Sequence, residues 1–184
     1  MKRLCDMVVT IFGSSLAGND SPEYAIAYEI GKGFAGLGLT ICNGGYGGTM
    51  EATARGAKEA GGHTIGVTIA SSRSRHANPW IDEVITEKDL VTRLMKLIGL
   101  GDGFVVLKGG TGTFLELAAV WEFMSKGLIP RKPCVVWGNF WHPAIRSMQE
   151  ELTREGTPQA AQLITEAQSA QECVELLVTA LAAR

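Results

Sequence analysis

The chain has 184 residues, 46% hydrophobic and 20% charged, which is typical of a folded globular protein and excludes a disordered tail or a coiled coil. Seventeen Lys and Arg against 19 Asp and Glu give a formal net charge of −2, and no basic block indicates nucleic-acid binding. Glycine is in excess at 23 residues but lacks the three-residue period of collagen. At this length we expect a single domain, residues 1–184.

Short β-rich runs alternate along the chain with longer helical patterns. Several of the runs are apolar throughout, as expected of parallel strands covered on both faces. The expected strands are Met7–Phe12, Leu39–Asn43, Thr64–Ile69, Gly103–Leu107, Cys134–Trp137 and Gln162–Thr165.

The helical patterns have recognisable ends. Ser21 followed by proline and glutamate is typical of an N-cap, and the apolar pattern then runs to Phe34. Further helices are expected over Thr86–Leu100, from Pro143 to Gly156, and from a capping box at Ser169 almost to Arg184. The alternation predicts an α/β fold, a doubly wound parallel sheet of the Rossmann-like type in three α/β/α layers.

The segment Ala70–Asp82 is the least regular part of the chain. It follows an expected strand and carries Arg73, Arg75 and His76. Loops at the carboxyl ends of parallel strands bind ligands in α/β proteins, so this segment is either a ligand-binding loop or a solvated connection.

Three glycine-bearing loops each follow a strand and lead into a helix: residues 12–18, 43–51 and 108–116, called here the first, second and third glycine loops. Such loops present consecutive backbone N–H groups, and the helix that follows adds its positive end, so phosphate is the natural ligand. The candidate phosphate- or nucleotide-binding residues are Gly13, Ser14, Ser15, Gly44, Gly45, Gly47, Gly48, Gly109, Gly110, Thr111, Gly112 and Thr113. The other glycines, Gly31 among them, look like ordinary helix ends and turns.

Common nucleotide motifs are missing. The first glycine loop does not match G-x-G-x-x-G, and the second strand ends in Cys42-Asn43 instead of the acid that holds a ribose of NAD. No G-x-x-x-x-G-K-[ST] is present either. A dinucleotide dehydrogenase and a P-loop ATPase are therefore disfavoured.

The third glycine loop, Lys108-Gly-Gly-Thr-Gly-Thr-Phe-Leu-Glu116, resembles the P-G-G-x-G-T-x-x-E signature of the LOG-like family of Rossmann-fold proteins. The first loop matches the family's G-S-S and the second its G-G-x-G-G-x-M-E form, so the likeness runs from about Met7 to Pro133. The family includes cytokinin riboside 5′-monophosphate phosphoribohydrolases, proteins labelled lysine decarboxylase-like, and relatives of the molybdenum cofactor carrier protein.

The resemblance implies that Arg93 and Glu116 are the catalytic pair of a hydrolase, that the partner is a nucleoside monophosphate or a related phosphate-bearing small molecule, and that the protein is a homodimer. Pairing with Arg93 would keep Glu116 ionised, as a role in activating a nucleophile needs. Two positions depart from the family pattern, because Leu94 replaces a lysine and Lys108 replaces the motif's proline.

The residues themselves leave alternatives open. Glu116 also fits a capping box with Thr113, and Arg93 fits an exposed helical ion pair with Asp89. Glu51 either faces the site or only the helix dipole. Ser14 and Ser15 are expected to contact phosphate or ribose, since no histidine has triad spacing.

Two functions therefore remain from the sequence. The first is a phosphoribohydrolase that cleaves a nucleoside 5′-monophosphate to base and ribose 5-phosphate; the second is a non-catalytic carrier of a nucleotide or of a molybdenum-cofactor-type phosphate. We expect no cofactor, no metal, no nucleic acid and no membrane as partners, and a cytoplasmic location. No metal is expected because the four cysteines are scattered without metal-ligand spacing, at Cys5, Cys42, Cys134 and Cys173. The cytoplasmic location is expected because the sequence shows neither a signal-peptide pattern nor an apolar run long enough to span a bilayer.

Overall fold

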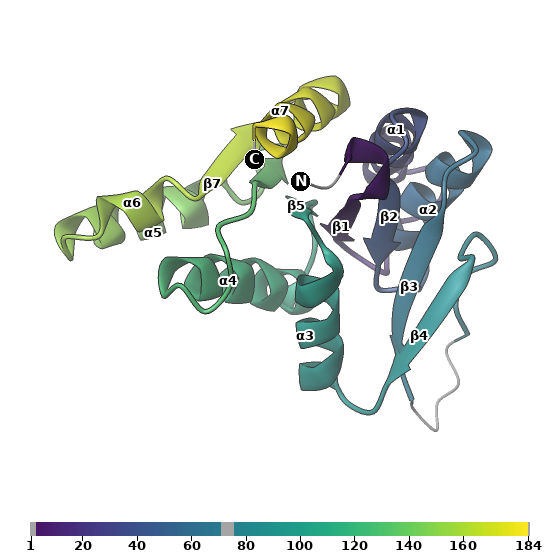
Figure 1. The fold of residues 1–184 in the computed structure, drawn as a ribbon, viewed down its shortest axis with the longest axis horizontal. Coiled ribbons are helices and arrows are strands. Elements are labelled where there is room, and N and C mark those ends of the chain that lie inside the picture. The colour runs from purple at the N-terminus through teal and green to yellow at the C-terminus, as the bar shows by residue number, and fades with distance from the viewer. Residues whose placement is uncertain (1–2, 71–75, 184) are drawn as a thin grey trace.

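The computed structural model describes residues 3–70 and 76–183. Within these residues, seven strands form one sheet in the order β4-β3-β2-β1-β5-β6-β7, and every neighbouring pair is parallel (Figure 1). The strands are β1 (Val8–Phe12), β2 (Thr40–Asn43), β3 (Thr64–Ile69), β4 (Glu83–Glu87), β5 (Gly103–Val106), β6 (Cys134–Trp137) and β7 (Ile164–Ala167). The predicted Rossmann-like α/β architecture is confirmed.

Helices cover both faces of the sheet. One buried cluster joins α1, α2 and α7 to the sheet, and a second joins α3, α4 and α5 to the opposite face. The helices are α1 (Pro22–Gly36), α2 (Thr49–Glu59), α3 (Leu90–Leu100), α4 (Thr111–Ser125), α5 (His142–Arg154), α6 (Pro158–Ala161) and α7 (Ala170–Ala182), and a 3-10 turn, η1 (Leu4–Asp6), precedes β1. No helix within residues 3–70 and 76–183 is both long and apolar enough to cross a lipid bilayer.

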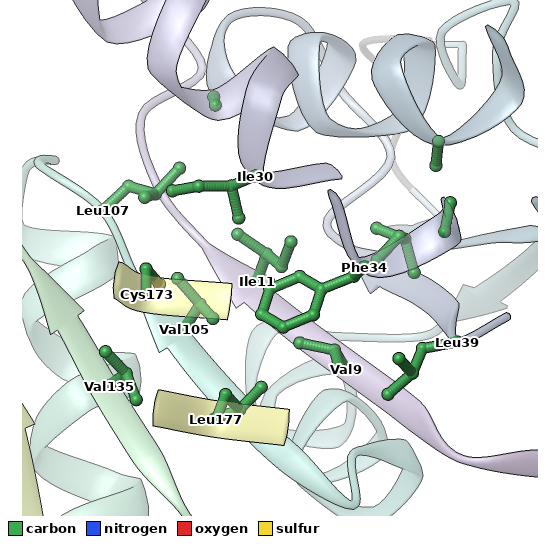
Figure 2. Packing of buried hydrophobic residues seen from close by; sticks show 14 of the residues in the cluster. Val9, Ile11, Ile30, Phe34, Leu39, Val105, Leu107, Val135, Cys173 and Leu177 are labelled. Carbon is green, nitrogen blue, oxygen red and sulfur yellow. The ribbon is translucent and has the colours of Figure 1, made fainter. Parts of the chain in front are cut away.

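The central strands are mostly apolar because each of their faces meets a helical layer. In β1, Val9 and Ile11 join the cluster under α1, whereas Phe12 joins the cluster on the other face. Figure 2 shows Ile30 and Phe34 of α1 packed against this strand, all fully or almost fully buried. Each such side chain contributes about 1.5–3 kcal/mol through removal from water, which holds the strand ends, and the loops after them, in place.

Helices α1 and α2 pack with their backbones in contact. A methyl group on Gly31 would overlap the carbonyl oxygen of Thr53, and one on Gly56 would overlap the carbonyl oxygen of Tyr28. The interpretation of Gly31 as an ordinary helix-end glycine was therefore wrong, since it lies inside α1 where only glycine allows this approach.

Two predicted boundaries were wrong. The helix expected over Thr86–Leu100 begins at Leu90, because Asp89 is its N-cap and forms a capping box with Thr92. The preceding residues, Glu83–Glu87, form the edge strand β4, which was not predicted from the sequence. The last strand lies two residues later than expected, at Ile164–Ala167.

The strand order places a crevice at the carboxyl edge of the sheet. The chain builds outward from β1 to β4, then returns to β5 on the other side of β1 and builds outward to β7. The order reverses between β1 and β5, and in open α/β sheets ligands bind outside the strand ends at such a point. The first and third glycine loops follow these two strands.

Candidate functional site

The first and second glycine loops are locked together. The carbonyl oxygen of Ser14 accepts hydrogen bonds from the N–H of Thr49 at 2.9 Å and from its hydroxyl at 3.2 Å. Gly48 has a φ of +66° and lies so close to the Ser14 carbonyl that a side chain would overlap it. The first N–H of α2 is thus satisfied by the protein, and the two loops form one unit.

The second glycine loop is also supported from beneath. Asn43 is fully buried; its Oδ1 accepts from the N–H of Gly45 at 2.8 Å, and its Nδ2 donates to the Met50 carbonyl at 2.9 Å. From the segment before β4, Asn78 donates to the Tyr46 carbonyl at 2.8 Å. This loop therefore has a defined conformation independent of any ligand.

The third glycine loop is the most open of the three. Gly110 is the N-cap of α4, and no side chain caps this end of the helix. Gly110 and Gly112 have no heavy atom within 4 Å of the position that a Cβ would occupy, and Thr111 is exposed. The Thr113 side chain is buried against Gly109. The start of α4 thus combines open space with the positive end of a helix dipole.

Arg93 lies under the second glycine loop, projecting from the first turns of α3. It is buried; its Nε donates to the Val67 carbonyl at 2.7 Å and its Nη2 donates to the Gly44 carbonyl at 3.2 Å. Its guanidinium carbon lies 5.5 Å from the centroid of the Tyr46 ring. The alternative of an exposed pair with Asp89 was wrong, because Asp89 caps α3 instead.

Glu116 points from α4 toward Arg93, with 3.9 Å between its Oε1 and Arg93 Nη1. Its side chain is 14% exposed. Burial raises the pKa of this carboxyl to about 7, and the Arg93 charge opposes the rise only in part. The expectation that Arg93 keeps Glu116 ionised needs correction, because burial outweighs a pair too long for a hydrogen bond. The capping-box alternative was wrong too, since Thr113 is the third helical residue and not the N-cap.

The comparisons with known proteins decide the family. A family model described as the SLOG cluster4 family matches residues 6–173. The chain belongs to the SLOG cluster4 family. It is 35% identical over 129 residues to a cytokinin riboside 5′-monophosphate phosphoribohydrolase of Mycobacterium tuberculosis, covering 65% of this chain and 68% of that protein. It is 30% identical over 152 residues to the same-named protein of Rhodococcoides fascians, covering 80% and 76%.

The fold comparison agrees with the Rossmann-like architecture. The molybdenum cofactor binding protein of Rippkaea orientalis superposes with a TM-score of 0.70 at 24% identity, covering 94% of each chain. The resemblance to the LOG-like family stated from the three glycine loops is confirmed.

In this SLOG cluster4 member, two hollows flank the tip of the first glycine loop. The first hollow has a volume of about 330 Å³, and the second about 250 Å³. The first is lined by Ser14, Leu16, Ala17, Gly18, Ser21, Glu23, Lys108 and Gly109; the second by Ser15, Leu16, Tyr46, Gly47 and His76. The Lys108 ammonium and the Glu23 carboxylate form an ion pair at 2.7 Å in the wall of the first hollow, which ties the third glycine loop to α1.

Glu23 and Tyr46 also line the candidate site, and neither was predicted from the sequence. Tyr46 lies between the glycines of the second loop, and its hydroxyl accepts a hydrogen bond from the Ile69 N–H at 3.0 Å. An aromatic residue inside a glycine-rich loop is the signal that could have identified it.

The remaining candidates are placed as follows. Glu51 lies in the first turn of α2 beside Gly47, and Leu94 packs into the apolar cluster between α3 and the sheet. Arg73 and Arg75 lie outside the described residues. Among the residues that the structure describes, no group of three or more His, Cys, Asp and Glu side chains could hold a metal ion.

Proposed function

We propose that this protein hydrolyses the N-glycosidic bond of a nucleoside 5′-monophosphate, releasing the free base and ribose 5-phosphate. The observation that carries the proposal is the buried Arg93–Glu116 pair beside the open start of α4, in a chain of the SLOG cluster4 family. The phosphoribohydrolase names of its relatives in Mycobacterium tuberculosis and Rhodococcoides fascians support the same reaction class.

The 5′-phosphate would bind at the start of α4. Backbone N–H groups of Gly110–Thr113 point out of the helix end, and the exposed Thr111 hydroxyl adds a donor. Hydrogen bonds from neutral donors to a phosphate are charge-assisted, and the helix dipole favours the negative charge. Ser14 and Gly109 line the same hollow, so the loop that carries Ser14 and Ser15 lies beside this end of α4 and would contact the ribose.

Glu116 would act at the anomeric carbon. In the reaction, the bond between C1′ and the base nitrogen breaks with its electron pair leaving on the base, which takes up one proton. Water adds to C1′ and loses a proton. The transition state has oxocarbenium character, so an adjacent carboxylate stabilises it, and the same group can take the proton of the attacking water. A pKa near 7 suits that proton transfer at neutral pH.

Arg93 would orient Glu116 and limit the rise of its pKa. Its two backbone hydrogen bonds, to Val67 and Gly44, hold the guanidinium in a single position. A lysine could not make both bonds while also facing the carboxylate, because its ammonium lacks the planar fork of an arginine.

The test is direct assay of the products. Incubation with AMP and with isopentenyl-AMP should release free base and ribose 5-phosphate in equal amounts. Glu116→Gln should lower the rate at least 100-fold, whereas Glu122→Gln, on the exposed side of α4, should leave it unchanged. No base released from any nucleoside monophosphate at high protein concentration would overturn the proposal.

A second candidate is a non-catalytic carrier of a nucleotide or of the molybdenum cofactor. It is favoured by Lys108 and Leu94, which replace the motif's proline and the lysine of the family pattern. Calorimetry with AMP and with molybdopterin separates the two: binding without turnover, unchanged in Glu116→Gln, supports the carrier.

We also propose that the protein is a homodimer. Helix α3 exposes Leu90, Val91 and Met95, three large apolar side chains on one stretch of surface. Sedimentation at micromolar concentration should return a dimer, and a monomer alone would contradict this.

A further inference from the structure

Leu16 is held in solvent at the tip of the first glycine loop. It is 87% exposed. Its position does not result from fraying, because its N–H donates to Ser14 Oγ at 3.1 Å and Ser14 in turn accepts from the Thr49 N–H at 2.9 Å. Single exposed leucines are common on protein surfaces, so the position of this one matters more than its exposure. It lines both hollows beside the crevice.

The two hollows differ in chemistry. The first contains the Lys108–Glu23 ion pair, so it suits charged or hydroxylated groups. The second has the Leu16 side chain and Tyr46 as walls, with Ser15, Gly47 and His76 supplying a few polar groups. An aliphatic and an aromatic residue beside side chains that can form hydrogen bonds suit a planar heterocycle, which has an apolar face and polar edges.

The second hollow also lies on the side of the proposed catalytic pair. Tyr46, which lines it, has the Arg93 guanidinium 5.5 Å from its ring centroid. Arg93 in turn faces Glu116 at 3.9 Å. A nucleotide with its phosphate at the start of α4 and its anomeric carbon beside Glu116 would therefore direct its base toward Tyr46 and not toward Lys108.

We propose that the hollow formed by Ser15, Leu16, Tyr46, Gly47 and His76 is the nucleobase subsite, and that Leu16 packs on the face of the base. This inference rests on the proposed function and adds to it the residue that distinguishes a nucleotide from its sugar phosphate. A planar aromatic nitrogen base covers Leu16 and removes it from water, whereas ribose 5-phosphate leaves it exposed.

The experiment compares two ligands that differ only by the base. AMP and ribose 5-phosphate are titrated calorimetrically into the protein, with Glu116→Gln present in every sample so that AMP is not consumed. Leu16→Ala should weaken AMP binding about tenfold and change ribose 5-phosphate binding less than twofold, because only the base contacts the lost methyl groups. Leu128→Ala is the matched control, since Leu128 is a similarly exposed leucine in the turn after α4.

The possible results distinguish failure of the proposed nucleobase subsite from failure of the proposed function. Equal AMP affinity in the Leu16→Ala and parent proteins would overturn the subsite and leave the proposed function standing. Equal losses for both ligands would overturn it too, because they would indicate a role in loop structure. If the parent binds neither ligand, the proposed function itself fails.

Discussion

Replacing Glu116 by glutamine should alter how the stability of the protein depends on pH. In the native protein the carboxyl is almost buried and its pKa is raised from an ordinary value of 4.5 to about 7. Below about pH 4 the carboxyl is protonated in both the folded and the unfolded chain and contributes nothing. Between 4.5 and 7 the unfolded chain ionises while the folded chain keeps its proton, so rising pH favours unfolding.

The magnitude follows from the two pKa values. At 1.36 kcal/mol per pH unit, the difference between 4.5 and about 7 corresponds to a penalty of about 3 kcal/mol, fully present above pH 7. Glutamine does not titrate, so the stability of Glu116→Gln relative to the native protein should increase by about 3 kcal/mol between pH 4 and pH 8.

Urea denaturation of both proteins across this range measures the difference, and subtraction removes the contribution of every other titrating group. Glu122→Gln on the same helix is the control and should run parallel to the native protein. A difference that stays constant with pH would refute the reasoning about burial. A difference of opposite sign would mean that the attraction of Arg93 outweighs the loss of solvation.

Three further predictions concern other parts of the molecule. Gly44→Ala should lower hydrolase activity at least 100-fold, because the added methyl group overlaps Arg93 Nη2. Gly36→Ala is the control and should keep full activity, because its methyl group meets no atom within 4 Å. Equal activities of the two variants would show that the position of the guanidinium is unimportant. Lys108→Met should change the free energy of unfolding by less than about 1 kcal/mol in urea titrations, because the ion pair between Lys108 and Glu23 is half-exposed. A larger loss of stability would contradict this prediction. A thiol reagent should modify Cys5 alone in the folded protein, because the other three thiols are buried and burial raises their pKa to about 12. Fast reaction of a second thiol would contradict this prediction.

The strands that the sequence predicts best are those buried on both faces. β1 and β5 differ from their predicted bounds by one residue at most, because β5 carries no polar side chain and β1 only that of Thr10. β4 was missed because an edge strand beginning and ending in glutamate needs little burial, and its charged residues at Glu83 and Glu87 also suit a helix start. Edge strands lack the pattern that two-sided burial imposes.

The candidate site, like the fold, could be predicted in part from the sequence. Its location at three strand-to-helix loops follows from glycine spacing, and Arg93 with Glu116 came from the family resemblance. The surroundings of Glu116 could not be predicted, since burial of that carboxyl depends on how α3 and α4 lie against the sheet. The sequence likewise could not show that Gly44 and Gly48 serve internal contacts while Gly110 and Gly112 face open space.

The backbone contact between α1 and α2 has a consequence for the evolution of the site. The last residues of the second glycine loop form the start of α2, which is pressed against α1 at Gly31 and Gly56. Any larger residue at either position would push the two helices apart. That displacement would move the Ser14–Thr49 connection and, through it, both loops on that side of the crevice. A substitution at Gly31 would therefore affect ligand affinity as well as stability, although this glycine lies outside the three glycine loops.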